Sequence, residues 1–209
     1  MSKVNGKYMK DENNEIFSPI TSSESVIMGG GRTLNNLFGI RDFTQQSTAS
    51  ASQAFYLNHS GIAITNWYLI RIEGTIVPSG IGSNAKALRI SINDKAARQC
   101  YGISTRNVNG TTTNYAYVNA ESNNAYLGDL MIEGNSTPIK ISLYKELNSA
   151  WITCIADMGV CDSGGTYNWF HYQGQFSYAV ADLDPINTIK LLASYKLSGM
   201  LSLEVYFYQ

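Results

Sequence analysis

The sequence has little charge, and the charge it has is balanced. Charged residues make up 15% of the 209 residues, whereas about 25% is usual for a soluble domain. Lysine and arginine number 15 against 16 aspartate and glutamate, so the formal net charge is -1. A chain without an excess of basic residues is poorly suited to a nucleic-acid backbone, so we expect no nucleic-acid partner.

Long apolar runs and cysteine pairs are also missing. The longest apolar stretch, residues 67–72, contains Arg71 and is far shorter than the roughly 20 residues that cross a bilayer, so we expect no membrane insertion. The polar first residues predict that the chain carries no secretory signal. Cysteine occurs three times without a Cys-x-x-Cys motif, which favours reduced thiols over a disulfide framework.

Residues for catalysis and metal binding are scarce. The two histidines, His59 and His171, and the three cysteines lack the spacing of a zinc site. The chain has no Gly-x-Ser-x-Gly elbow, and the glycine run at 29–31 lacks the Lys-Ser/Thr ending of a phosphate-binding loop. We therefore expect no enzyme, no catalytic residue, no metal and no cofactor. A pair of carboxylates that cleaves glycosidic bonds stays an alternative, drawn from Asp129, Glu133, Asp157 and Asp162.

Strict alternation of apolar and polar residues dominates the chain from residue 54 to 209. Turn residues such as Asn109-Gly110 and Ser163-Gly164-Gly165 separate the alternating runs. Such short alternating strands with polar turns are typical of an antiparallel sandwich. The pattern predicts an all-β, jelly-roll-like β-sandwich head over 54–209. Its predicted inward residues are Ile62, Ile64, Tyr68, Ile70, Ile72, Leu88, Ile90, Ile92, Ile139, Ile141, Leu143, Ile152, Cys154, Ala156, Phe176, Tyr178, Val180, Leu201, Leu203, Val205 and Phe207.

The first 53 residues have a different composition. Residues 1–43 consist of polar turns and short apolar pieces, none long enough to bury itself, which predicts a short extended N-terminal arm. Residues 44–53 are almost all small, polar and uncharged, which is typical of a linker or a surface loop.

One stretch, residues 161–174, combines aromatic rings with amides and a carboxylate. Rings stack on the apolar face of a sugar, and Asp, Asn and Gln bond its hydroxyls, so this stretch predicts a saccharide-binding site. The candidate residues are Asp162, Tyr167, Trp169, His171 and Gln173. The alternating spacing of three of the rings, Tyr167, Trp169 and His171, is also typical of packing in the core or between subunits, and for Trp169 it favours packing over ligand contact.

Two further tryptophans differ from their neighbours in the face of the strand on which they are expected to lie. Trp67 and Trp151 fall on the face opposite the aliphatic residues of their expected strands. This position predicts a second buried surface, such as an oligomer interface, or a ligand site.

The N-terminal residues suggest a family. The run 7–21, from Lys7-Tyr8-Met9-Lys10-Asp11-Glu12 to Ser18-Pro19-Ile20-Thr21, and the later Gly31-Arg32-Thr33-Leu34 resemble the opening of phage tail-tip, baseplate and tail-fibre proteins. The resemblance covers about 40 residues, and Asn14 stands where these proteins usually have glycine. It implies a virion-attachment arm followed by a β-sandwich head, commonly a homotrimer that binds host-surface glycans.

We therefore expect a phage tail protein that is assembled in the host cytoplasm and located in the virion tail. Its expected partners are two further copies of itself, other tail or baseplate proteins through the arm, and a host-surface glycan. Two alternatives are a purely structural tail or baseplate protein that binds no receptor, and a lectin-like carbohydrate-binding module.

Overall fold

The structure is a computed structural model, and its elements form two compact units, residues 1–40 with 209, and residues 41–208. It describes residues 3–5, 8–10, 27–28, 32–33, 40–47, 54–57, 63–80, 87–108, 110–117, 121–122, 124–129, 133–161 and 169–208.

The first unit contains two small antiparallel hairpins. Strand β1 (Lys3–Asn5) pairs with β2 (Tyr8–Lys10), and β3 (Ile27–Met28) pairs with β4 (Arg32–Thr33). Two-stranded ribbons of two or three residues are marginal on their own in water. The extended arm stays a prediction, because most of residues 1–39 lie outside the described residues.

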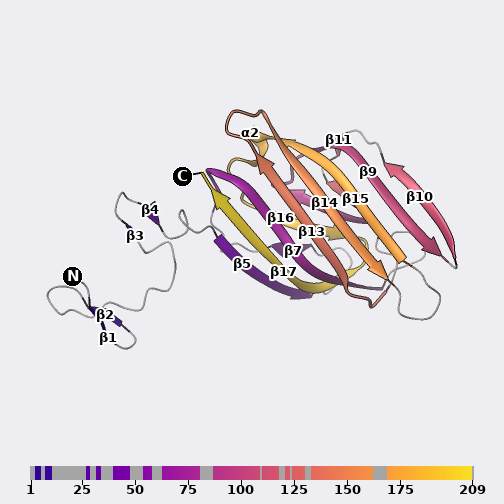
Figure 1. Ribbon diagram of the computed structural model, residues 1–209, viewed down its shortest axis with the longest axis horizontal. Coiled ribbons are helices and arrows are strands. Elements are labelled where there is room, and N and C mark those ends of the chain that lie inside the picture. The colour runs from indigo at the N-terminus through magenta and orange to yellow at the C-terminus, as the bar shows by residue number, and fades with distance from the viewer. Residues whose placement is uncertain are drawn as a thin grey trace. The chain divides into compact units, whose positions relative to one another are not determined.

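The second unit consists of two sheets (Figure 1). The larger has nine strands in the order β10-β9-β15-β14-β13-β7-β17-β5, with β11 also paired to β9, and the smaller has the order β12-β8-β16-β6. The strands of the larger sheet are β5 (Ile40–Ser47), β7 (Trp67–Ser79), β9 (Ala97–Val108), β10 (Thr111–Tyr117), β11 (Glu121–Ser122), β13 (Thr137–Lys145), β14 (Trp151–Cys161), β15 (Trp169–Ala179) and β17 (Lys196–Phe207). Those of the smaller sheet are β6 (Phe55–Leu57), β8 (Ala87–Ile92), β12 (Ala125–Asp129) and β16 (Ile189–Ala193), and a short helix, α2 (Val180–Leu183), follows β15.

The predicted all-β sandwich is confirmed. Neighbouring strands from β10 to β17 run antiparallel, and strand β12 of the smaller sheet contacts β9, β14 and β15 of the larger one. Three consecutive strands, β13, β14 and β15, are also neighbours in the sheet and form a meander. The jelly-roll connectivity stays a prediction.

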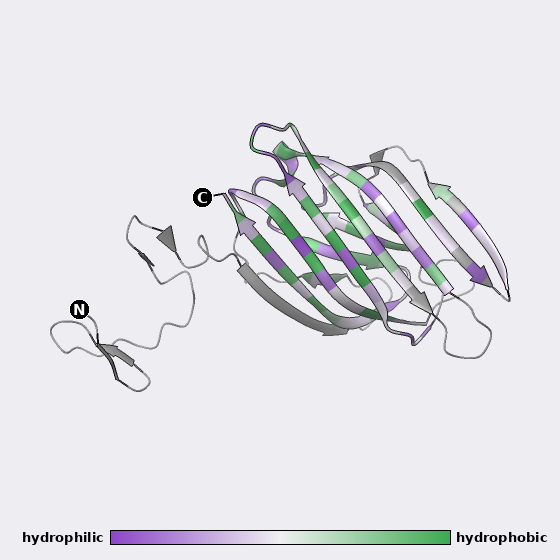
Figure 2. Ribbon diagram, viewed as in Figure 1, coloured by the Kyte–Doolittle hydropathy of each residue, from purple (hydrophilic) through white to green (hydrophobic). Residues whose placement is uncertain are grey.

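The core lies between the two sheets and follows the predicted alternation. Figure 2 shows hydrophobic and hydrophilic bands alternating along the long strands of the larger sheet. Most of the inward residues named from the sequence are buried. Tyr68 is exposed, Val180 at the start of α2 and Phe207 at the end of β17 are only partly buried, and Ile62 lies outside the described residues. The smaller sheet adds Phe55, Leu57, Leu127, Ile189 and Leu191 to the same core. Burial of apolar area, at about 25 cal/mol per Å², is the main source of stability in such a sandwich.

The position expected for Trp67 is wrong. Trp67 is fully buried with the aliphatic residues of β7, and Tyr68 is exposed in its place. The cause is a register shift: Phe207 pairs with Trp67 and Tyr206 pairs with Leu69, so Tyr68 is the extra residue of a β-bulge. A bulge shifts the alternation by one residue, which turns the large indole into the core. Trp151, by contrast, is 40% exposed, on the face opposite Ile152 as expected.

The start of the second unit also differs from the expected boundaries. Strand β5, which pairs with β17, begins at Ile40 and continues through Ser47. Residues 41–47, assigned from the sequence to the arm and the linker, thus include the edge strand of the larger sheet. The rest of the expected linker, 48–53, lies outside the described residues except at its border with Ala54.

One contact between the sheets lies directly behind the candidate site. The ring of Tyr172 on β15 covers Gly102 and Gly174, which pair across β9 and β15. Its hydroxyl donates a hydrogen bond of 2.9 Å to the carbonyl oxygen of Tyr126 on β12, and the two rings meet edge to face at 5.8 Å. A Cβ atom at Gly102 would lie 2.9 Å from the Tyr172 hydroxyl, and one at Gly174 would overlap it. The two glycines therefore make room for the ring that joins the sheets.

We predict that Gly174→Ala lowers the free energy of unfolding by about 1–3 kcal/mol, because the added methyl group overpacks against Tyr172. The measurement is denaturant unfolding of the full chain. Gly159→Ala on the neighbouring strand is the matched control, since a Cβ there meets its nearest atom at 3.4 Å. Equal stability of the two variants would contradict the assigned role of the glycine pair.

Candidate functional site

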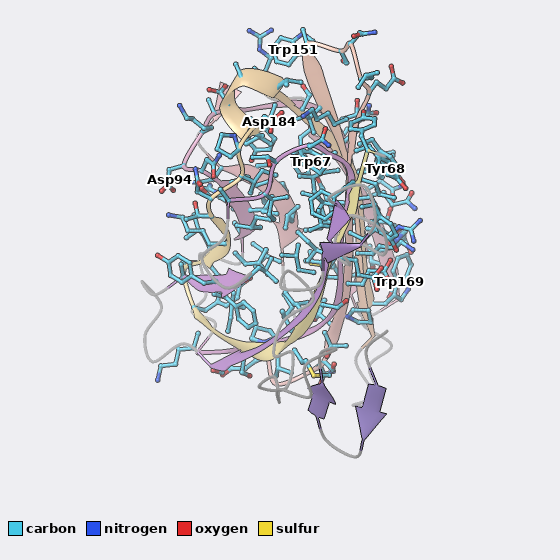
Figure 3. All side chains as sticks on the ribbon, turned by 90° about the vertical axis from the view of Figure 1, so that its left-hand side faces the viewer. Trp67, Tyr68, Asp94, Trp151, Trp169 and Asp184 are labelled. Carbon is cyan, nitrogen blue, oxygen red and sulfur yellow. The ribbon has the colours of Figure 1, made fainter. Side chains whose placement is uncertain are left out.

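Three of the predicted saccharide-binding residues lie on the outer face of β15. The burial of this strand alternates, with Phe170, Tyr172 and Phe176 turned to the core. Trp169 and His171 are partly exposed and Gln173 is exposed, all on the opposite face. Successive outer residues are about 6.6 Å apart, at roughly 3.3 Å per residue. Figure 3 shows Trp169 on the solvent side of the larger sheet, so it is not part of the core between the sheets.

The other two predicted residues, Asp162 and Tyr167, lie outside the described residues. The three described ones are held by strands on both sides. Trp169 pairs with Cys161 of β14 and with Asn107 of β9. The Asn107 side chain accepts a hydrogen bond from the Gly110 amide at 3.1 Å and donates one to Thr112 at 3.0 Å, which ties down the turn beside the indole.

The structure adds Asp157 to the site. Its Oδ2 accepts a hydrogen bond from Gln173 Nε2 at 2.9 Å and lies 3.3 Å from His171 Nε2. Its Oδ1 takes part in neither contact. Asp157 pairs directly with Gln173 across β14 and β15. From the sequence, Asp157 was considered only as a possible catalytic carboxylate, because its partner depends on the strand register.

The chemistry of this group suits binding. One indole, one imidazole, one amide and one carboxylate are presented side by side, with about half of the His171 and Asp157 side chains exposed, at 45% and 47%. The residues that pair with His171 are Thr105 and Gly159. Neither is a serine or cysteine nucleophile beside the imidazole, as a hydrolytic triad requires.

A second group of rings, which we name the tyrosine cluster, lies on the same outer face and consists of Tyr68, Tyr144, Tyr206 and Tyr208. The Tyr68 ring is 6.2 Å from that of Tyr206 and 5.5 Å from that of Tyr208. Tyr144 and Tyr206 flank Leu69 from the two neighbouring strands. Leu69 is only 9% exposed although it lies on the outer face. The rings thus form a packed apolar surface.

The sequence analysis did not identify this cluster as a site. A signal exists in the closing strand, where Tyr206 and Tyr208 alternate with apolar residues. The contribution of Tyr68 could not be found in this way, because it depends on the bulge in β7.

Charged groups on this face are compensated by close neighbours. Lys140 forms an ion pair of 3.0 Å with Glu73. Arg71 and Glu204 pair across β7 and β17, and the Arg71 guanidinium lies 5.5 Å from the centre of the Tyr206 ring. On β9, the Arg98 guanidinium lies 4.5 Å from the Trp151 ring.

Two of the cluster tyrosines have a raised pKa. The hydrogen bond from the Tyr206 hydroxyl to Glu204 Oε2, 2.9 Å long, raises the pKa of Tyr206, and partial burial adds to this, while Arg71 acts in the opposite direction. Partial burial, with a smaller contribution from Glu146, raises the pKa of Tyr208. Both hydroxyls therefore stay protonated, and so neutral, up to a higher pH than the hydroxyl of an ordinary tyrosine.

The residues that the structure describes contain no group of three or more His, Cys, Asp or Glu side chains that could hold a metal ion. Among the same residues, no helix has both the length and the apolarity needed to cross a bilayer. Comparisons with family models, with curated proteins and with solved structures find no match for the chain.

We predict that Glu204→Gln lowers the pKa of Tyr206 toward the ordinary value of about 10, because the variant removes the charged acceptor. The raised pKa means that this hydrogen bond stabilises the fold fully below the unfolded pKa and is lost as the pH rises through the folded pKa. Titration of the tyrosine Cζ signals by NMR measures the effect. The pKa of Tyr208 serves as an internal control and should not change. An unchanged pKa of Tyr206 would contradict the assignment.

Proposed function

We propose that the chain is a phage tail protein whose β-sandwich head binds a host-surface saccharide during adsorption. The observation that carries this proposal is the group formed by Trp169, His171, Gln173 and Asp157. It combines a partly exposed ring with hydrogen-bonding groups on one open face. The resemblance of the first 40 residues to phage tail proteins supports the virion as the location.

Each residue of the group has a role in this proposal. The Trp169 ring stacks on the apolar face of a sugar and removes apolar area from water. Asp157 accepts hydrogen bonds from sugar hydroxyls through Oδ1, and a charged acceptor makes the stronger bond. His171 and Gln173 hold the carboxylate through Oδ2 and offer further polar atoms. The same set lacks a positioned nucleophile, which favours binding over cleavage of the glycan.

The N-terminal arm attaches the head to other tail or baseplate proteins in this proposal. Residues 1–40 belong to one compact unit and residues 41–208 form the other. Its described hairpins are too small to be stable alone, so a partner that orders them is physically reasonable. Assembly takes place in the host cytoplasm.

We predict that Trp169→Ala weakens adsorption to purified host cell-wall polysaccharide about tenfold or more, because one stacked tryptophan contributes roughly 1–3 kcal/mol. The melting temperature should change little, since the ring is outside the core. Asp157→Asn should also weaken adsorption. Tyr56→Ala is the control, because Tyr56 is 48% exposed on the smaller sheet.

A wild-type protein that is folded but retained by no host polysaccharide would contradict this function and favour a purely structural tail protein. A fall of many degrees in the melting temperature of Trp169→Ala would show that the ring supports the fold instead. Release of reducing ends from the polysaccharide would show an enzyme.

The head also associates as a homotrimer in this proposal. Large apolar side chains are exposed outside the saccharide site, with Leu147 at 71% on the turn after β13 and Met200 at 53% on β17, and each is available for contact with another copy. We predict a mass of three chains of 23.0 kDa each in light scattering. A mass of one chain throughout the micromolar range would contradict the trimer.

A further inference from the structure

The tyrosine cluster and the Trp169 site lie on the same face of the same sheet, well separated along its strands. Trp169 pairs with Cys161 of β14, and Tyr144 pairs with β7 at Leu69 and with β14 at Thr153. Cys161 and Thr153 are eight residues apart on one strand, which is about 26 Å at roughly 3.3 Å per residue. Figure 3 shows Tyr68 and Trp169 on the same side of the larger sheet, at different heights.

The surface between the two aromatic groups is mostly polar. Asp157, Gln173 and Gln175 lie on the outer faces of β14 and β15, and Thr153 and Ser177 pair with each other farther along the same strands. These side chains offer amide, hydroxyl and carboxylate groups, and the one apolar side chain among them, Ile155, is 50% exposed and pairs with Gln175. A ligand that extends from one aromatic group to the other would therefore meet hydrogen-bonding groups along its path.

Two pairs of opposite charges lie along this path, in addition to the Asp157 carboxylate. Glu73 and Lys140 form their ion pair next to Asp157, which is the register partner of Lys140. Arg71 and Glu204 stand opposite each other beside the tyrosine cluster. A face with both signs in adjacent pairs attracts neither a polyanion nor a polycation strongly. Such a face suits an uncharged ligand.

The rings are open to solvent at both ends of the path. Tyr68 and Tyr144 are 41% and 43% exposed, and Trp169 is partly exposed. Small ligands usually bind in concave pockets that bury most of their surface. An open sheet face gives each sugar fewer contacts, so strong binding requires several contacts along one chain. Two sites engaged by one ligand raise the overall affinity because the second contact is intramolecular.

We propose that this face binds an extended, uncharged polysaccharide along its length, with Trp169 as the stacking surface at one end and the tyrosine cluster at the other. This inference rests on the proposed saccharide-binding function and deepens it. The protein contacts several sugar units in the interior of the polysaccharide rather than its terminal sugar. The Tyr206 and Tyr208 hydroxyls donate to Glu204 and to the Lys145 carbonyl oxygen, so their oxygens remain as acceptors for sugar hydroxyls.

The test uses the full chain and a ladder of oligosaccharides. Purified bacterial-surface polysaccharides are first screened for retention of the protein, and the retained one is partly hydrolysed and separated by length. Calorimetry then gives the affinity for each length. We predict a rise of about tenfold or more once the oligosaccharide can reach both aromatic groups. Binding should change little with ionic strength, because an uncharged ligand has no charge for salt to screen.

Variants distinguish this inference from the proposed function. Tyr144→Ala and Tyr68→Ala should abolish the extra affinity for long chains and leave binding of the shortest ones unchanged. Trp169→Ala should weaken both. Tyr56→Ala, on the other sheet, should match the wild type at every length. Two cluster variants are used because Tyr68 also packs against other rings, whereas Tyr144 stands opposite Leu69 of β7.

Each other outcome overturns a stated part of the account. An affinity that does not depend on length, or cluster variants that bind long chains like the wild type, would overturn the extended-chain inference and leave the proposed function intact. A change of oligomeric mass in the cluster variants would show that the cluster is an interface between copies, which also overturns the inference. Retention of no polysaccharide, or full binding by Trp169→Ala, would overturn both.

Discussion

The two-residue period of the β-strand is the constraint on which this molecule depends. Each long strand of the larger sheet must turn alternate residues toward the smaller sheet, because burial of those apolar residues holds the sandwich together. The remaining residues of each strand then form the outer face of the sheet, because successive side chains point to opposite faces. On β15, burial of Phe170, Tyr172 and Phe176 places Trp169, His171 and Gln173 together outside. Core and candidate site are thus two results of one backbone geometry.

The rigidity of the site follows from the same packing. Directly behind it, the Tyr172 ring lies over the glycine pair of β9 and β15 and donates its hydrogen bond to the smaller sheet. Cross-strand pairing on both sides of β15 sets the positions of the outer side chains. A site built on a rigid sheet loses less conformational entropy when it binds than one built on loops. This helps an open face to bind a ligand without a pocket.

Most of the core could be predicted from the sequence, whereas the site could be predicted only in part. Local alternation is enough to find inward residues such as Ile139 and Leu203. It fails at Trp67, because the bulge beside it is set by pairing with β17, whose residues are 140 positions away. It likewise cannot find Asp157, whose place beside Gln173 depends on the β14–β15 register. Local alternation does not determine which distant strands pair with each other. The order of the strands in the sheet is therefore known only from the structure.

The most direct test of the account uses its three tryptophans, which the structure places in different surroundings. Trp67 is fully buried, while Trp151 and Trp169 lie on the outer face. The measurement is an NMR titration of the indole N–H signals with the polysaccharide that the protein retains. The account predicts a large shift of the Trp169 signal and no shift of the Trp67 signal. Saturating saccharide that leaves the Trp169 signal unchanged would contradict the claim that this face binds the glycan.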